Sequence, residues 1–262
     1  DVYIVQSTSN PVNHHLMEAL IMADACKRAS ASFITLVSPY FGYARQERKA
    51  SPRQPISAKL VAELIETAGY ERVVSLELHN LAIQGFFSIP LDHLYCSPLF
   101  IPYLKKNYLD KYTVVVSPDA GGVERARAIA KGLGCEIAVI DKRRHKPNHS
   151  AVMHLVGDVK NKKCLIIDDI VDTGGSLVRA AEAVKNEGAA QVDAAIVHPV
   201  LSGDALKRIE DSSLSSLITT NSIPVKQPNQ ASEKIISINI AELIAKAIKR
   251  IHNQESISSL FS

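Results

Sequence analysis

The residues with the clearest chemical character follow a short apolar run in the second half of the chain. This run, residues 164–167, leads to two adjacent carboxylates, Asp168 and Asp169, then to the loop 172–176 with the sequence Asp-Thr-Gly-Gly-Ser, and to a helical pattern over 177–186. Backbone N–H groups at such a loop can bind a phosphate, because glycines let the anion approach and the helix dipole favours negative charge. The paired carboxylates can accept hydrogen bonds from two vicinal hydroxyls. A phosphate beside a diol indicates a ribose phosphate, whereas the simpler alternative is an acidic turn that serves solubility.

A second turn of this kind lies earlier in the chain. Asp119, Gly121 and Gly122 follow the apolar run 113–117 and precede another helical pattern. Asp119 could bind Mg²⁺, which prefers oxygen ligands, and the two glycine amides could bind a diphosphate. The alternative is that Asp119 caps the helix while the glycines shape the turn. Two such turns suit a substrate with phosphate groups at both ends.

Two basic stretches and one histidine are further candidates. Residues 43–49, with Arg45 and Gln46, could grip a triphosphate or could be a solvated run of charge. Residues 142–150 begin with Lys-Arg-Arg and are rich in Pro, Asn and His, which predicts a mobile cationic lid or else an exposed surface loop. His79 ends a strand-like run, where a histidine is more often structural than a ligand of Mg²⁺.

Alternating apolar and amphipathic segments must position these residues. The alternation predicts an α/β fold with parallel sheets and helical crossovers. The expected strands are 2–6, 33–37, 73–78, 113–117, 137–140, 164–168 and 192–197, and the expected helices are 16–28, 57–68, 121–132, 176–186 and 240–252. Because sites in parallel sheets form at the carboxyl ends of strands, and the candidate residues follow strand ends, we expect the site there.

A break in the pattern near Ser97-Pro98 predicts a boundary between two domains. We expect a first domain over 1–97, a second over 98–234, and a strand-and-helix tail over 235–262 that packs on the first domain. The sequence begins with Asp1 directly before a strand-like run, so the first domain is expected to be incomplete at its N-terminus.

The bulk composition narrows the class of protein. The chain has 262 residues, 46% hydrophobic content and a net charge of +3, which suits a globular protein and does not indicate nucleic-acid binding. Its four cysteines form no CxxC pair, which favours a reducing compartment. The sequence has no stretch of about 18 uninterrupted apolar residues, so no membrane span is predicted. These features predict a cytoplasmic protein without a membrane or nucleic-acid partner.

Taken together, these stretches resemble the PRPP synthetases, also called ribose-phosphate pyrophosphokinases, over nearly the whole chain. The matching stretches are 6–8, 13 with 16–18, 40–49, 55–59, 84–87, 117–130, 141–144, 152–153 with 157–159, 165–176, 198–199, and 255–258 with 260–261. A phosphoribosyltransferase would share only the loop 168–176. The resemblance implies two phosphoribosyltransferase-like domains and the conversion of ATP and ribose 5-phosphate to PRPP and AMP.

The resemblance also implies a role for each matching residue. ATP contacts are implied for Arg45 and Gln46, and Mg²⁺ contacts for His79 and Asp119. Diphosphate contacts are implied for Asp119, Gly121 and Gly122. Catalytic roles are implied for Lys142 and Arg144. Ribose 5-phosphate contacts are implied for Asp168, Asp169, Asp172, Thr173, Gly174, Gly175 and Ser176. A regulatory phosphate or ADP site is implied for Gln84, Ser256, Ser258 and Phe261, and a homo-oligomer built from dimers, up to a hexamer, is implied as the assembly.

The sequence departs from the family pattern at several positions. Glu77 stands where the family usually has Asp, Asn80 replaces a small residue, and His14-His15 replaces Asp-Asn. The family's N-terminal segment that holds adenine has no counterpart in this sequence. Two alternatives therefore stay open: a non-catalytic regulatory homologue of the synthetase, and a phosphoribosyltransferase, which would leave Arg45, Gln46 and His79 without a role.

Overall fold

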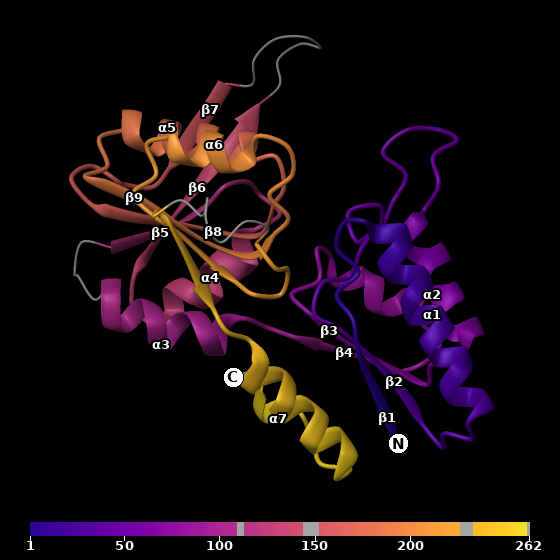
Figure 1. Ribbon diagram of the computed structural model, residues 1–262. Coiled ribbons are helices and arrows are strands. Elements are labelled where there is room, and N and C mark those ends of the chain that lie inside the picture. Colours follow the sequence, from indigo (N-terminus) through magenta and orange to yellow (C-terminus); the bar gives the residue numbers. More distant parts are fainter. Residues whose placement is uncertain (109–112, 144–151, 226–232, 261–262) are drawn as a thin grey trace. The chain divides into compact units, whose positions relative to one another are not determined.

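The chain folds into two compact units, each with its own parallel sheet (Figure 1). The computed structural model describes residues 1–108, 113–143, 152–225 and 233–260. One unit combines Asp1–Cys96 with Ala241–Ser262, and the other is Ser97–Ile240. The chain therefore crosses from one unit to the other twice.

The first unit is built on a four-stranded sheet in which all neighbouring strands are parallel. Its strands, in spatial order, are β1 (Val2–Val5), β2 (Ile34–Ser38), β3 (Arg72–Leu76) and β4 (Leu91–Leu94). Its helices are α1 (Val12–Arg28), α2 (Ser57–Ala68) and α7 (Ala241–His252), with the short 3₁₀ helices η1 (Leu81–Phe86) and η3 (Ser258–Leu260). Parallel neighbours need crossover connections, and α1 and α2 supply two of them.

The side chains of β1 show how helices cover both faces of this sheet. Ile4 is buried in one cluster with Leu16 and Ala19 of α1. Its neighbour Tyr3 contacts His252 of α7, with 6.4 Å between the ring centroids. Because successive strand residues point to opposite faces, α1 and α7 cover opposite faces of the sheet (Figure 1). The C-terminal helix thus completes the first unit.

The second unit is built on a seven-stranded sheet. Its strands, in spatial order, are β11 (Ile235–Ile238), β10 (Leu217–Thr220), β9 (Gln191–Pro199), β8 (Lys163–Val171), β5 (Thr113–Ser117), β6 (Glu136–Arg143) and β7 (Val152–Val156). All pairs are parallel except β6 and β7. The helices are α3 (Ser97–Tyr108), α4 (Val123–Leu133), α5 (Gly175–Asn186) and α6 (Ala205–Glu210). Helices α5 and α6 lie on one face of the sheet, and α3 and α4 on the other (Figure 1).

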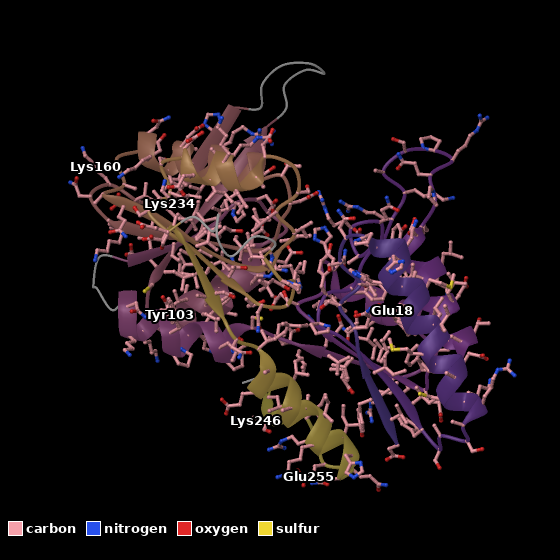
Figure 2. All side chains as sticks on the ribbon, in the orientation of Figure 1. Glu18, Tyr103, Lys160, Lys234, Lys246 and Glu255 are labelled. Carbon is pink, nitrogen blue, oxygen red and sulfur yellow. The ribbon has the colours of Figure 1, made fainter. Side chains whose placement is uncertain are left out.

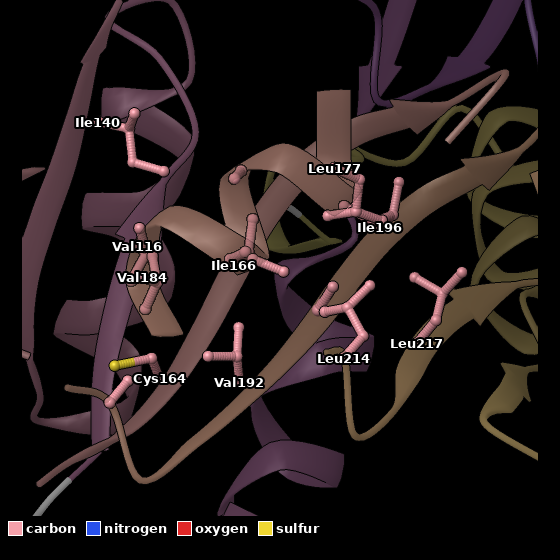
Figure 3. Packing of buried hydrophobic residues seen from close by; sticks show 14 of the residues in the cluster. Val116, Ile140, Cys164, Ile166, Leu177, Val184, Val192, Ile196, Leu214 and Leu217 are labelled. Atoms are coloured by element: carbon pink, nitrogen blue, oxygen red, sulfur yellow. The ribbon is translucent and has the colours of Figure 1, made fainter. Parts of the chain in front are cut away.

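The core beneath α5 holds the central strands in place (Figure 3). Ile166 of β8 and Ile196 of β9 are almost fully buried against Leu177 and Val184 of α5. Burying one such side chain stabilises the fold by roughly 1.5–3 kcal/mol. This packing fixes the start of α5 relative to the end of β8, which is where the expected phosphate loop lies.

The predicted fold class, an α/β protein with parallel sheets, is confirmed. Several individual elements differ from the prediction. Strand β8 runs on to Val171, so Asp168 and Asp169 lie within the strand and do not follow it. Residues 235–238, expected in a tail on the first unit, instead pair with β10 in the second unit. Strands β4, β7 and β10, helix α6, and helix α3 with its internal Pro102, were not predicted. No helix in the described ranges is long and apolar enough to cross a membrane.

Candidate functional site

The candidate site of the second unit lies where the strand order of its sheet reverses. Strand β5 pairs with β8 in parallel, and from this pair the chain builds the sheet outward in opposite directions. At such a switch point the loops that leave adjacent strand ends diverge, which opens a crevice for a ligand. The loop after β5 carries Asp119, Gly121 and Gly122, and the end of β8 carries the two carboxylates and the loop 172–176. The sequence-predicted turns therefore follow neighbouring strands.

The loop between β8 and α5 has the geometry of an anion site. Gly174 has φ of +76°, a left-handed conformation that glycine adopts without strain, and it directly precedes α5. As the N-cap residue, Gly174 has no side chain with which to cap the helix. Its first-turn amides have no acceptor within the helix itself, so they can donate to a bound anion together with the positive end of the helix dipole. A phosphate is the ligand that fits this arrangement best.

The segment that follows β9 braces this loop. The Ser202 amide donates to the Asp172 carbonyl at 3.1 Å, and the Ser202 hydroxyl also donates to the Asp172 carboxylate. The Arg208 guanidinium of α6 donates to the Thr173 carbonyl at 3.0 Å. These contacts hold the loop in place. Sequence analysis missed both bracing residues, because the only signal was their place after the next strand end.

Two adjacent carboxyl groups near the end of β8, Asp168 and Asp169, repel each other when both are ionised. Asp169 is only 4% exposed, and its amide donates to the Asp168 carboxylate at 3.0 Å. The pKa of Asp168 is raised to about 7, mainly by burial and next by the Asp169 carboxylate, whereas the Arg125 guanidinium lowers it. Burial and the neighbouring carboxylate thus favour the protonated form of Asp168. In the ionised state it offers acceptors for two hydroxyl groups.

Arg125 of α4 is a site residue that sequence analysis did not single out. Its Nη1 atom lies 3.5 Å from Asp168 Oδ1 and 3.6 Å from Asp169 Oδ1. Its side chain is 18% exposed. The sequence places Arg125 in the first turn of the helix after Gly122, which marks it as close to the expected site. The residues near Arg125 in the sequence do not indicate that its partners lie on β8.

The turn after β5 uses Asp119 to organise the start of α4. The Gly121 and Gly122 amides donate to Asp119 Oδ1 at 2.9 and 3.1 Å, and the Ser117 hydroxyl donates to the Asp119 carbonyl at 2.7 Å. Helix α4 begins at Val123 and its N-cap is Gly122, so Asp119 shapes the turn before the helix and is not the N-cap that sequence analysis considered. A diphosphate that used the same two amides would have to replace the Asp119 carboxylate. The displaced carboxylate would then be available to a cation.

The residues expected to bind ATP and metal in the first unit lie on exposed loops. Arg45 and Gln46 are exposed, and the backbone there is held by bonds from Gln46 N to Tyr43 O at 2.9 Å and from Ala58 N to Gln46 O at 3.2 Å. His79 is also exposed. The two residues expected to contact Mg²⁺, His79 and Asp119, belong to different units. Within the described ranges, no group of three or more His, Cys, Asp or Glu residues is placed to hold a metal.

The loop that carries His79 is tied to the end of β4. Glu77, with φ of +44°, donates from its amide to the Leu94 carbonyl at 2.8 Å, and its buried carboxylate accepts from the Cys96 amide at 2.9 Å. The Leu78 amide donates to Nε2 of the buried His93 at 2.9 Å. Three bonds to β4 and the residue Cys96 beyond it thus hold Glu77 and Leu78, which directly precede His79.

The residues expected at a regulatory site lie in the first unit or outside the described residues. Ser256 and Ser258 meet through a hydroxyl–hydroxyl bond of 3.0 Å, and Arg250 donates to the Ser256 carbonyl at 2.7 Å. Gln84 is exposed on η1, and Phe261 lies outside the described residues.

The two residues expected to be catalytic fall at the edge of a described range. The backbone of Lys142 lies in β6 opposite Met153, so it precedes the expected loop and belongs to the strand. Arg144 lies outside the described residues.

Comparison with known proteins gives a consistent result along the chain. Residues 1–69 match the model of the N-terminal domain of ribose phosphate pyrophosphokinase, and residues 142–262 match that of the phosphoribosyl synthetase-associated domain. The chain is 54% identical over 260 residues to ribose-phosphate pyrophosphokinase 1 of Listeria innocua, covering 99% of this chain and 81% of the relative. It is 55% identical over 261 residues to ribose-phosphate pyrophosphokinase of Rhizobium meliloti, covering 100% of this chain and 84% of the relative. The crystal structure of phosphoribosylpyrophosphate synthetase from Mycobacterium smegmatis superposes with a TM-score of 0.91 at 40% identity, covering 97% of this chain and 83% of that one.

Proposed function

Because this chain belongs to the ribose-phosphate pyrophosphokinase family, we propose that it transfers the β,γ-diphosphate of ATP to the C1 hydroxyl of ribose 5-phosphate. The products are PRPP and AMP. The observation that best supports the substrate is the joint presence of an uncapped, glycine-led helix start and a carboxylate pair on β8. The helix start suits the 5-phosphate, and the pair suits the 2- and 3-hydroxyls of the ribose.

The chemistry is a displacement at phosphorus. The C1 hydroxyl oxygen forms a bond to the β-phosphorus, the bond from that phosphorus to the bridging oxygen of AMP breaks, and the hydroxyl proton leaves to solvent. Such a reaction needs positioning and charge neutralisation more than covalent catalysis. Asp168, Asp169 and the loop 172–176 hold the ribose phosphate, and Arg45 and Gln46 bind ATP. Lys142 and Arg144 neutralise the charge that develops on the transferred group.

Mg²⁺ is the cofactor that the residues suit best. It prefers oxygen ligands and is often held by one or two carboxylates together with substrate phosphates. A single carboxylate, Asp119, beside a phosphate-type turn fits that pattern, with His79 as a further contact. When bound, the ion neutralises phosphate charge. The homo-oligomer and the phosphate or ADP effectors stay predictions from the family resemblance.

The reaction and its cationic residues can be tested in one experiment. Phosphorus NMR of the protein with ATP, ribose 5-phosphate and Mg²⁺ should show PRPP and AMP. Lys142→Ala should lower the maximal rate by about 10² to 10³, with little change in the Michaelis constant for ribose 5-phosphate.

Lys160→Ala is the matched control, because Lys160 is an exposed lysine on the surface of the same unit (Figure 2). It should keep the wild-type rate. Release of ADP in place of AMP would contradict the diphosphate transfer. A Lys142→Ala rate equal to that of the control would remove Lys142 from the mechanism.

A further inference from the structure

One guanidinium approaches both carboxylates that the proposed function assigns to the ribose diol. Nη1 of Arg125 lies 3.5 Å from Asp168 Oδ1 and 3.6 Å from Asp169 Oδ1. The side chains of Arg125, Asp168 and Asp169 are 18%, 30% and 5% exposed. Water therefore screens the contact with Asp169 less than it would screen a surface pair, and the contact with Asp168 is half-buried. The two distances are nearly equal, so the positive charge of Arg125 acts on both carboxylates and not on only one of them.

The pair needs such a cation to act as an acceptor of hydroxyl protons. An ionised carboxylate is only an acceptor, whereas a protonated one also carries an O–H donor. Burial and mutual repulsion both favour uptake of a proton by two adjacent carboxyls, and a nearby opposite charge favours the ionised form. In agreement, burial and Asp169 raise the pKa of Asp168, and Arg125 lowers it.

The other groups around the pair offer little competing charge. On β9, the residue in register with Asp168 is the apolar Ile196. The nearby titratable group on that strand is His198, which is buried and bonded through Nδ1 to the Ser222 hydroxyl at 2.9 Å. Among the residues that the structure describes, the charged groups that act on Asp168 are Asp169 from its own strand and Arg125 from α4.

We propose that Arg125 is a positioning residue of the ribose 5-phosphate site, which keeps the Asp168–Asp169 pair ionised and oriented to receive the ribose diol. This inference rests on the proposed function. Arg125 acts on the substrate through the two carboxylates. It therefore sets the lower pH limit of sugar-phosphate binding, and it sharpens the selectivity for a sugar with both hydroxyls.

The test is calorimetric titration of ribose 5-phosphate into wild-type protein and Arg125→Gln between pH 5.5 and pH 9. An opposite charge at this distance typically lowers a carboxyl pKa by about 1–3 units, so its removal should move the acid limb of binding up by about 1 unit. Below both limbs the dissociation constant should then rise by about 10-fold, and at pH 9 the two proteins should converge. Titration of the ligand's own phosphate is common to all variants and cancels in the comparison.

Two further variants separate charge from folding. Arg125→Lys keeps the positive charge, so its acid limb should lie closer to that of wild type than the acid limb of Arg125→Gln does. Arg127→Gln removes an exposed arginine from the same helix and should leave the acid limb unchanged. Arg125→Gln should also weaken binding of 2-deoxyribose 5-phosphate less than that of ribose 5-phosphate, because one of the two hydroxyls is missing.

An Arg125→Gln protein that melts earlier but keeps the wild-type acid limb would overturn the inference, and Arg125 would then be a packing residue. An equal loss of affinity for both sugar phosphates would also overturn it. If wild-type protein did not bind ribose 5-phosphate at any pH, the proposed function itself would fail.

Discussion

At the scale of single residues, the end of β8 is where function and stability oppose each other. Asp168 and Asp169 occupy strand positions in a region that is otherwise apolar, from Cys164 to Ile167 and again at Ile170. A buried carboxyl is less costly when neutral than when ionised. The proposed role of the pair as an acceptor of the ribose hydroxyls, however, needs the ionised form. The raised pKa of Asp168 measures this opposition.

Asp168→Asn should therefore stabilise the fold at alkaline pH. The folded-state pKa of Asp168 is about 7 and the ordinary value is 3.8, so the folded protein binds more protons than the unfolded chain between about pH 4 and pH 7. The favourable contribution of the neutral acid is fully present below about pH 4 and is lost as the pH rises through 7. Asparagine does not ionise, so the free energy of unfolding of Asp168→Asn relative to wild type should be higher at pH 8 than at pH 5. Urea unfolding at both pH values measures it.

Asp158→Asn is a suitable control with the opposite sign. The Lys160 amide and the Lys162 ammonium lower the pKa of this exposed carboxyl, so its contribution is present at neutral pH and is lost as the pH falls. The variant should be slightly less stable than wild type at pH 8. If Asp168→Asn instead lost more stability at pH 8 than at pH 5, the ionised carboxylate would be a net stabiliser.

At the scale of elements, local sequence predicted the phosphate loop but not what surrounds it. The glycines and hydroxyls of 172–176 lie within a few residues of one another, so their pattern indicated the turn before α5, and the phosphate ligand stays a prediction. Arg125 and Asp168 meet only because β5 and β8 are neighbours in the sheet, and strand order cannot be read from an apolar pattern. Helix α3 was missed because its prolines indicated a break, and β10 because serines surround its apolar residues.

The same limit applies to the loop of His79, which depends on the neighbouring strand β4. His93 interrupts the apolar pattern of that strand, yet its Nε2 atom accepts the buried Leu78 amide at 2.9 Å. His93→Leu removes this acceptor, and an unsatisfied buried amide costs about 1–3 kcal/mol. We expect it to lower the free energy of unfolding and to raise the Mg²⁺ concentration needed for half-maximal activity.

His93→Asn offers a replacement acceptor and should recover part of both effects. Urea unfolding and a Mg²⁺ titration of AMP release measure them. Because Leu78 and His93 lie in the first unit, affinity for ribose 5-phosphate should not change. A loss of stability with an unaltered Mg²⁺ requirement would show that the loop only supports the fold and does not position a metal contact.

At the scale of the whole molecule, each unit has its own buried core. One core gathers residues of β1–β3, α1 and α2, and the other gathers residues of β5, β6, β8, β9 and α5. The candidate ribose 5-phosphate residues all belong to the second unit. A ligand stabilises only the folded structure that binds it. If the two units unfold separately, ribose 5-phosphate should raise the stability of the second unit alone. The change in stability on binding therefore tests whether the two units unfold together.

We expect ribose 5-phosphate to protect the second unit selectively from hydrogen exchange. At a concentration of about 100 times its dissociation constant, a ligand adds about 2.7 kcal/mol to the stability of the unit that binds it. Core amides of β8 and β9 that exchange through global opening of that unit should then exchange about 100-fold more slowly, whereas those of β2 and β3 should change little. Exchange of backbone amides followed by mass spectrometry measures both sets in one sample. The double variant Asp168→Asn with Asp169→Asn should lose this protection while it retains the exchange pattern of the free protein. Equal protection of the strands in both units would mean that the chain unfolds as one cooperative body, in spite of its two cores.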